Sequence, residues 1–147
     1  MAGRKMALIA LALSCIAPFG ANAARLTCGG VGSDARADLE ARSKDANLAL
    51  EFFAGKRGQF VADVDITVTP MGAGDAFSTT ADGPLCFARV APGRYRIEAS
   101  YRGATRLANA TVGNKGQAHV AVGFPESVAE PDPAPISAEE KRQASTQ

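Results

Sequence analysis

Few side chains in this sequence could carry out acid–base or metal chemistry. His119 is the only histidine, and no nearby serine forms a clear nucleophile pair with it. Asp63 and Asp65 could act as paired carboxylates or bind a cation, but calcium takes about six oxygen ligands, and only Asp75 and Asp82 are obvious further donors. We therefore predict no catalytic residue, no metal site and no cofactor, with His119 on the surface and the two aspartates on a solvated strand face. A hydrolase would require Asp63, Asp65 and His119 to surround one cleft.

Arginine is the residue type best placed to form a binding surface. Only one acidic residue, Glu98, lies among five arginines that are close together in the sequence: Arg89, Arg94, Arg96, Arg102 and Arg106. Arg94 and Arg96 would share one strand face, because strand side chains alternate with period two. Guanidinium groups suit carboxylates and phosphates, so the predicted partner is an acidic envelope protein or an anionic glycan or lipid. The alternative interpretation is a solvated face balanced by acidic residues elsewhere.

Residues 1–23 have the order of a bacterial secretory signal peptide. Two basic residues are followed by a mostly apolar run over residues 7–20 and by an Ala-Asn-Ala sequence that ends at Ala23. The run is shorter than the roughly 20 residues of a membrane span, and a lipid-attachment site at Cys15 fits poorly. We predict cleavage after Ala23 and a periplasmic or secreted protein without a transmembrane segment. The net charge of +1 argues against general nucleic-acid binding.

Cys28 and Cys86 remain after cleavage, and two thiols in an oxidising compartment are expected to pair. The disulfide would close a loop of about 58 residues, to which the chain-entropy model assigns about 4 kcal/mol. It would fix the N-terminal segment to the strand that contains Cys86. A redox-active pair is the alternative, but the sequence has no C-x-x-C motif to support it.

The N-terminal segment, residues 24–46, is predicted to contain one short helix. The glycine-rich residues 28–32 lack the preceding strand and the lysine of a phosphate-binding loop, so we interpret them as a flexible entry to the helix. Ser33 or Asp34 would cap it. Its apolar face is thin, and a helix of about twelve residues is marginal alone, so it should pack on the edge of another element.

The rest of the fold is predicted to be mainly β. The clearest alternation, in residues 59–69, places Phe60, Val64 and Val68 on one face. Turn signals every eight to twelve residues are typical of an antiparallel Greek-key sandwich. The seven predicted strands are 47–53, 59–69, 75–80, 85–90, 94–101, 104–112 and 117–124. The strand 75–80 is short and polar, which favours an edge position.

A corner precedes the strand 94–101. Pro92 and Gly93 fit a type II turn, whose twist does not match a tight two-residue hairpin. We therefore predict a wider corner that crosses between two sheets. Tyr95, just after the corner, would bury its ring and donate its hydroxyl to a loop carbonyl, as in a tyrosine corner.

The sequence ADGPLCFARVAPGRYRIEASYRG, residues 81–103, resembles the second half of a carboxypeptidase regulatory-like, or prealbumin-like, domain. The shared features are a turn glycine, a short apolar strand, a Pro-Gly-x-Tyr step and an alternating strand. DVDITVTPMG, residues 63–72, resembles an early strand and turn of the same domain. The likeness covers residues 47–124 and extends to small exported bacterial proteins with a Gly-Gly-Val-Gly segment. It implies a β-sandwich without catalytic residues, and the cysteine pair is not a feature of that module.

The functional prediction is an exported, non-enzymatic binding module with the arginine-rich strand face as its surface. The second hypothesis is a structural accessory of an envelope assembly, acting by strand addition at an edge such as 75–80. A hydrolase is the third. Residues 125–147 are rich in proline, glutamate and alanine, and are predicted to form an extended disordered tail.

Overall fold

The computed structural model of the chain describes residues 25–131. The predicted signal peptide, Cys15 and the part of the predicted tail from residue 132 onward lie outside the described residues. Within the described range, no helix is long and apolar enough to span a membrane.

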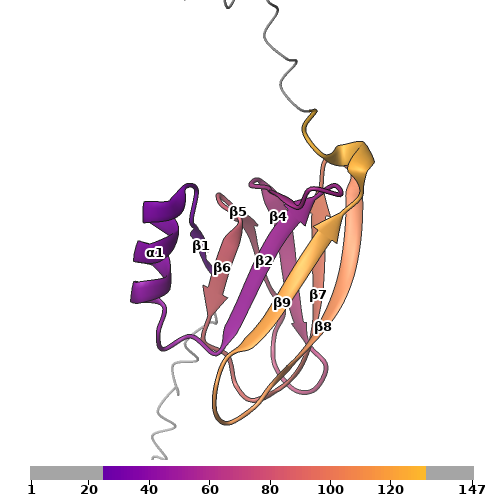
Figure 1. Cartoon of the computed structure of the whole chain (residues 1–147). Coiled ribbons are helices and arrows are strands. Elements are labelled where there is room, and N and C mark those ends of the chain that lie inside the picture. The colour runs from indigo at the N-terminus through magenta and orange to yellow at the C-terminus, as the bar shows by residue number, and fades with distance from the viewer. Residues whose placement is uncertain (1–24, 132–147) are drawn as a thin grey trace, which may run out of the picture.

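Two β-sheets face one another in a sandwich-like arrangement, with one helix lying on the outside of the first sheet (Figure 1). The first sheet contains β1 (Thr27–Gly29), β6 (Leu85–Ala88), β2 (Leu48–Ala54), β3 (Gln59–Phe60) and β9 (Ala118–Phe124). The second sheet has the order β5 (Phe77–Ala81), β4 (Val64–Pro70), β7 (Gly93–Tyr101) and β8 (Ala104–Val112). The helices are α1 (Ser33–Arg42) and a short 3-10 helix, η1 (Glu126–Val128). The mainly β prediction is confirmed.

The number of strands differs from the prediction, because the described chain has nine where seven were expected. The predicted strand 59–69 is two strands, β3 in the first sheet and β4 in the second. The chain changes sheet at Asp63, whose φ of 59° interrupts the extended backbone. This break shifts the alternation by one residue, so that Val61 is buried and Phe60 is 47% exposed. The expectation that Phe60 shares the core face with Val64 was therefore wrong.

The other added strand, β1, lies in the glycine-rich segment that was interpreted as a flexible entry to the helix. It pairs antiparallel with β6, and Cys28 stands directly opposite Cys86. The two sulfur atoms form the predicted disulfide, with the Cα atoms 4.1 Å apart. Three residues with a glycine show no periodicity, which explains why this strand was not predicted.

One strand pair is parallel, which corrects the prediction of a wholly antiparallel fold. β2 pairs with β9 along its full length, from Leu48 opposite Ala118 to Ala54 opposite Phe124. All other strand pairs within residues 25–131 are antiparallel. As a result, β9 and β8 are edge strands of different sheets at the same side of the sandwich (Figure 1).

The core fills the space between the two sheets with aliphatic and aromatic side chains. Phe52, Leu48 and Leu50 of β2 face Ile66 and Ile97 of the second sheet, and all five are at most 1% exposed. The alternation of apolar and polar residues along β4 and β7 is what places one set inside and the other in solvent.

The helix α1 packs on the outer face of the first sheet through one buried side chain. Leu39 contacts a small cluster formed with Ala49, Leu85 and Phe87. Gly32 is the N-cap and no side chain caps the helix, so the predicted capping by Ser33 or Asp34 was wrong. The helix is held by this packing, by the contact of Arg36 with the Phe60 ring and by the ion pair between Asp38 and Arg42 on its own surface.

The corner between β6 and β7 is confirmed as a crossing between the two sheets. The Tyr95 hydroxyl donates to the carbonyl of Ala91 at 2.5 Å, which is the predicted tyrosine-corner contact. Gly93 begins β7 with φ of 156°, far from the roughly +80° of a type II turn, so that turn type was wrong. A second contact supports the corner: the Asn47 side chain donates to the carbonyl of Val90 at 2.7 Å and accepts from its N–H at 2.9 Å.

Candidate binding surface

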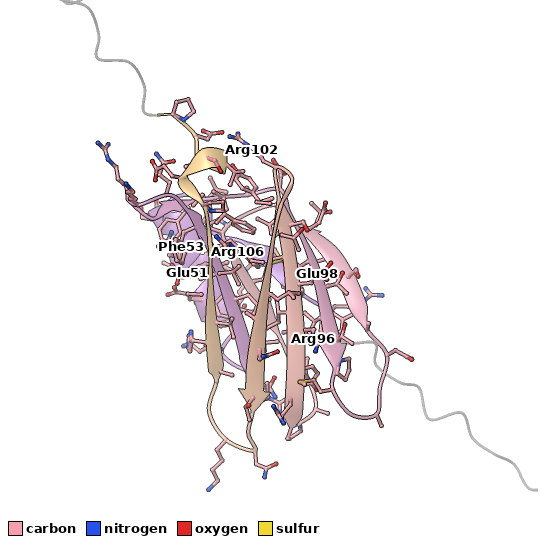
Figure 2. The ribbon with its side chains drawn as sticks, turned by 90° about the vertical axis from the view of Figure 1, so that its right-hand side faces the viewer. Glu51, Phe53, Arg96, Glu98, Arg102 and Arg106 are labelled. Carbon is pink, nitrogen blue, oxygen red and sulfur yellow. A yellow bond between two sulfur atoms is a disulfide. The ribbon has the colours of Figure 1, made fainter. Side chains whose placement is uncertain are left out.

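The outer face of the second sheet is open to solvent along its four strands, because α1 covers only the first sheet. Its side chains are mostly hydroxyls, amides and charges. β7 contributes Arg94, Arg96 and Glu98, which are all exposed. Figure 2 shows Arg96 and Glu98 following one another along this strand.

Arg94 and Arg96 form the only close pair among the five candidate arginines. They are two residues apart on one strand face, a separation of about 7 Å along the strand. Arg96 stands opposite Thr69 on one side and Asn109 on the other, and Arg94 stands opposite Thr111. Within residues 25–131, neither guanidinium makes an ion pair or a side-chain hydrogen bond. Both cations are therefore available to a ligand.

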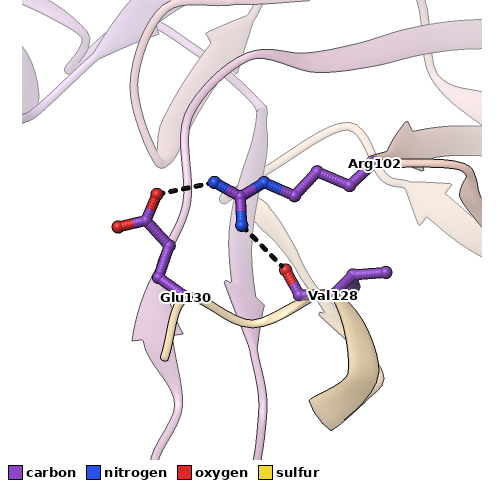
Figure 3. Close-up of polar contacts among 3 residues, drawn as sticks. All are labelled: Arg102, Val128 and Glu130. Carbon is purple, nitrogen blue, oxygen red and sulfur yellow. Dashed lines mark hydrogen bonds and ion pairs between the residues drawn. The ribbon is translucent and has the colours of Figure 1, made fainter. Parts of the chain in front are cut away.

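Two other arginines are occupied and lie elsewhere. Arg89 donates to the carbonyl of Asp45 at 2.6 Å, beside the first sheet. Arg102 lies in the turn between β7 and β8, where it forms an ion pair with Glu130 at 2.6 Å and a longer hydrogen bond to the carbonyl of Val128 at 3.5 Å (Figure 3). Arg102 thus fastens the segment after β9 to the end of the sandwich.

Arg106 is on the opposite side of its strand from the surface that holds Arg96. It stands opposite Ala99, a core residue that is 0% exposed, yet the arginine itself is exposed. This is explained by its place on β8, an edge strand. In Figure 2, Arg106 lies between the ribbons of β8 and β9, away from Arg96 and Glu98. The five arginines therefore do not share one face.

His119 and the two aspartates also lie apart. His119 is exposed on the outer face of the first sheet, where it lines a groove of about 700 Å³ together with Glu40, Asp45 and Arg89. Asp65 faces outward from the second sheet and accepts a hydrogen bond from Thr80 at 2.6 Å. Asp63 lines a third place, a cleft at the end of the sandwich. The three groups do not surround one cleft, which is the arrangement that a hydrolase would require.

Strand β5, which contains most of the predicted strand 75–80, is an edge strand of the second sheet. Its five residues, Phe77–Ala81, carry no charge and no proline, so one row of its backbone groups lacks the usual protection against another strand.

The most exposed large apolar residue of the sheet face was not identified from the sequence. Leu107 is 66% exposed and stands opposite Glu98. Its position in an alternating strand suggested nothing unusual, and only the register places it one strand from the Arg94–Arg96 pair. This leucine, opposite Glu98 and diagonal to Arg96, adds apolar contact area to a polar surface.

No protein-family model matches the chain, and no curated protein matches it significantly. The resemblance to the prealbumin-like domain therefore rests on the residues quoted above and on the two-sheet fold.

Proposed function

We propose that the protein is an exported, non-catalytic binding module of the bacterial cell envelope, with a prealbumin-like Greek-key sandwich as its scaffold. Export and a periplasmic or secreted location are inferred from the N-terminal sequence, and the disulfide between Cys28 and Cys86 is compatible with them. The scaffold assignment is supported by the two sheets, by the corner at Tyr95 and by the sequence resemblance.

The proposed binding surface is the outer face of the second sheet, and its partner is anionic. The observation that carries this proposal is the pair Arg94 and Arg96, two neighbouring guanidinium groups without an acidic partner on an uncovered sheet face. Asn109 and Thr111 beside them can donate further hydrogen bonds to an anion. Two cations at this spacing fit carboxylate or phosphate groups that repeat along a chain or a membrane surface.

The test compares Arg94→Ser/Arg96→Ser with Lys44→Ser/Lys115→Ser, which removes the same charge from other parts of the surface. Binding is measured to poly-glutamate, to a uronic-acid polysaccharide and to phosphatidylglycerol vesicles. We expect the wild type to bind at least one of them, the arginine variant to bind it at least tenfold more weakly, and the lysine variant to bind like the wild type. Equal weakening of binding by both variants would show a general charge effect and would contradict the proposal that the face with Arg94 and Arg96 is the binding surface.

The second candidate function is strand addition at β5, favoured by its position at the sheet edge without charge or proline. Main-chain hydrogen bonds are much less sensitive to salt than exposed ion pairs. A complex from envelope extracts that persists at about 1 M salt and is unchanged by Arg94→Ser/Arg96→Ser would favour this function over the anionic one.

A further inference from the structure

We infer that the cleft at the end of the sandwich, lined by Phe60, Asp63 and Arg102, binds a neutral saccharide. The cleft has a volume of about 450 Å³ and lies between the β3–β4 connection and the β7–β8 turn. Small-molecule sites commonly have roughly 300–1,000 Å³. This site is separate from the arginine pair, because Arg94 is at the beginning of β7 and the cleft is at its end.

The first element of the site is an aromatic ring that is fixed and still open. The Arg36 guanidinium lies 3.9 Å from the centre of the Phe60 ring, and this cation–π contact orients the ring. Arg36 does not line the cleft. Phe60 is 47% exposed although one face of its ring is covered, so the remaining surface of the ring is available. A ring of this kind is a platform for the C–H face of a pyranose.

The second element is a set of polar groups of both kinds around the ring. Gln59 offers an amide and Asp63 a carboxylate, and Arg102 lines the cleft with a guanidinium that is already bonded to Glu130. The backbone of Asp63 is held at this place by its N–H, which donates to the carbonyl of Ala81 at 2.7 Å. Hydroxyl groups of a sugar both donate and accept, so they suit this mixture better than an apolar ligand does.

The backbone conformation independently supports this cleft as a binding site. Among residues 25–131, only two non-glycine residues have positive φ, Asp63 at 59° and Arg102 at 46°, and both line this cleft. Arg102 and Gly103 form a two-residue hairpin turn, in which the first position usually carries Asn, Asp or Gly. Conformations of this kind are costly for other residues and collect at functional sites.

The charges of the cleft disfavour an anionic ligand. Arg102 is paired with Glu130 at 2.6 Å (Figure 3), and Asp63 adds a further negative charge, so an anion is not favoured. The described residues contain no group of three side chains suited to a metal ion. An uncharged ligand with an apolar face and hydroxyl edges fits the exposed ring and the mixed polar groups of the cleft.

The test is a titration of the full mature chain, followed by amide NMR shifts, with cellotriose, chitotriose and maltotriose as probes. We expect one of the three to shift the resonances of residues 59–63 and 101–102 with a Kd on the order of 1 mM or lower. Phe60→Ala should weaken this binding at least tenfold, whereas Phe60→Trp should retain it. Arg102→Asn, which suits the turn, should also weaken binding while the spectrum remains that of a folded protein.

The control is Leu107→Ala, which removes an exposed apolar side chain from the other surface and should bind the sugar normally. Arg94→Ser/Arg96→Ser should also bind normally, so failure of the anionic function and failure of this site are separate results. The inference is overturned if none of the three sugars shifts residues 59–63, or if Phe60→Ala binds as tightly as the wild type.

Discussion

The Asn47 side chain provides the most direct test of how the fold holds its corner. It makes two hydrogen bonds to the backbone of Val90, one as donor at 2.7 Å and one as acceptor at 2.9 Å. The Asn47 backbone is engaged separately, with its N–H bonded to Ala88 and its carbonyl to Ala118. Asn47→Ala therefore removes the side-chain bonds and leaves the strand pairing in place.

The expected loss of stability follows from the two hydrogen bonds removed and from the Val90 N–H and carbonyl that are left without a partner. A typical hydrogen bond contributes about 0.5–1.5 kcal/mol net, and a buried donor or acceptor without a partner costs about 1–3 kcal/mol. Val90 is buried, so its N–H and carbonyl are poorly replaced by water. We expect Asn47→Ala to lower the free energy of unfolding by about 2–3 kcal/mol, or the Tm by roughly 10–20 °C for a domain of this size.

Asn47→Asp makes the same contact dependent on pH. The ionised side chain can still accept from the Val90 N–H but brings a negative charge against the Val90 carbonyl, whereas the protonated form can donate to it. The pKa of the new carboxyl should therefore be raised in the folded state above the roughly 3.9 of the unfolded chain. Its stabilising contribution is present below the unfolded pKa and is lost as the pH rises through the folded pKa.

The assay is urea unfolding followed by circular dichroism at pH 4 and pH 7, with the wild type measured in parallel. Asn47→Asp should lose stability relative to the wild type on going from pH 4 to pH 7, and Asn47→Ala should not show this change. A loss below about 0.5 kcal/mol for Asn47→Ala, which is the range of ordinary surface substitutions, would refute the reasoning.

The disulfide, the packing of one glycine and the position of Arg106 each give a further test. Cys28→Ala/Cys86→Ala should lower the free energy of unfolding by about 4 kcal/mol, and the wild type measured in reductant should be as stable as this variant. A variant as stable as the oxidised wild type would contradict the entropic estimate. In Gly83→Ala the new Cβ would lie 2.2 Å from a backbone oxygen of β1, so we expect a loss of about 3 kcal/mol, against almost none for Gly72→Ala, which meets nothing within 4 Å. Arg106→Val should increase self-association in sedimentation velocity, because an inward-pointing charge at an edge prevents strand pairing, and an unchanged sedimentation coefficient would argue against this role.

The sequence identified the features that depend on local pattern. The alternation in residues 94–101 predicted the strand β7 and its buried side, and the Pro-Gly-x-Tyr step predicted a corner with a bonded Tyr95. The disulfide followed from the number of cysteines left after residue 23. Each of these depends on residue type and close spacing, which a single sequence contains.

The features that were missed depend on which sheet a strand joins. The alternation of residues 59–69 continues through Asp63, but the chain changes sheets there, and Phe60 leaves the core. In the same way, Arg96 and Arg106 both fall in alternating strands, yet the register of β7 with β8 puts them on opposite faces. Long-range register has no local signal, so the sequence placed Arg94 beside Arg96 but could not show that Arg106 lies on the other face.

The pairing of β2 with β9 determines when folding of the first sheet can be completed. Leu48 must meet Ala118, which lies 70 positions further along the chain, and contacts of such separation form slowly. Until residues 118–124 have been synthesised, β2 lacks its parallel neighbour in the first sheet. The first sheet can therefore be completed only after its last strand, β9, has been synthesised.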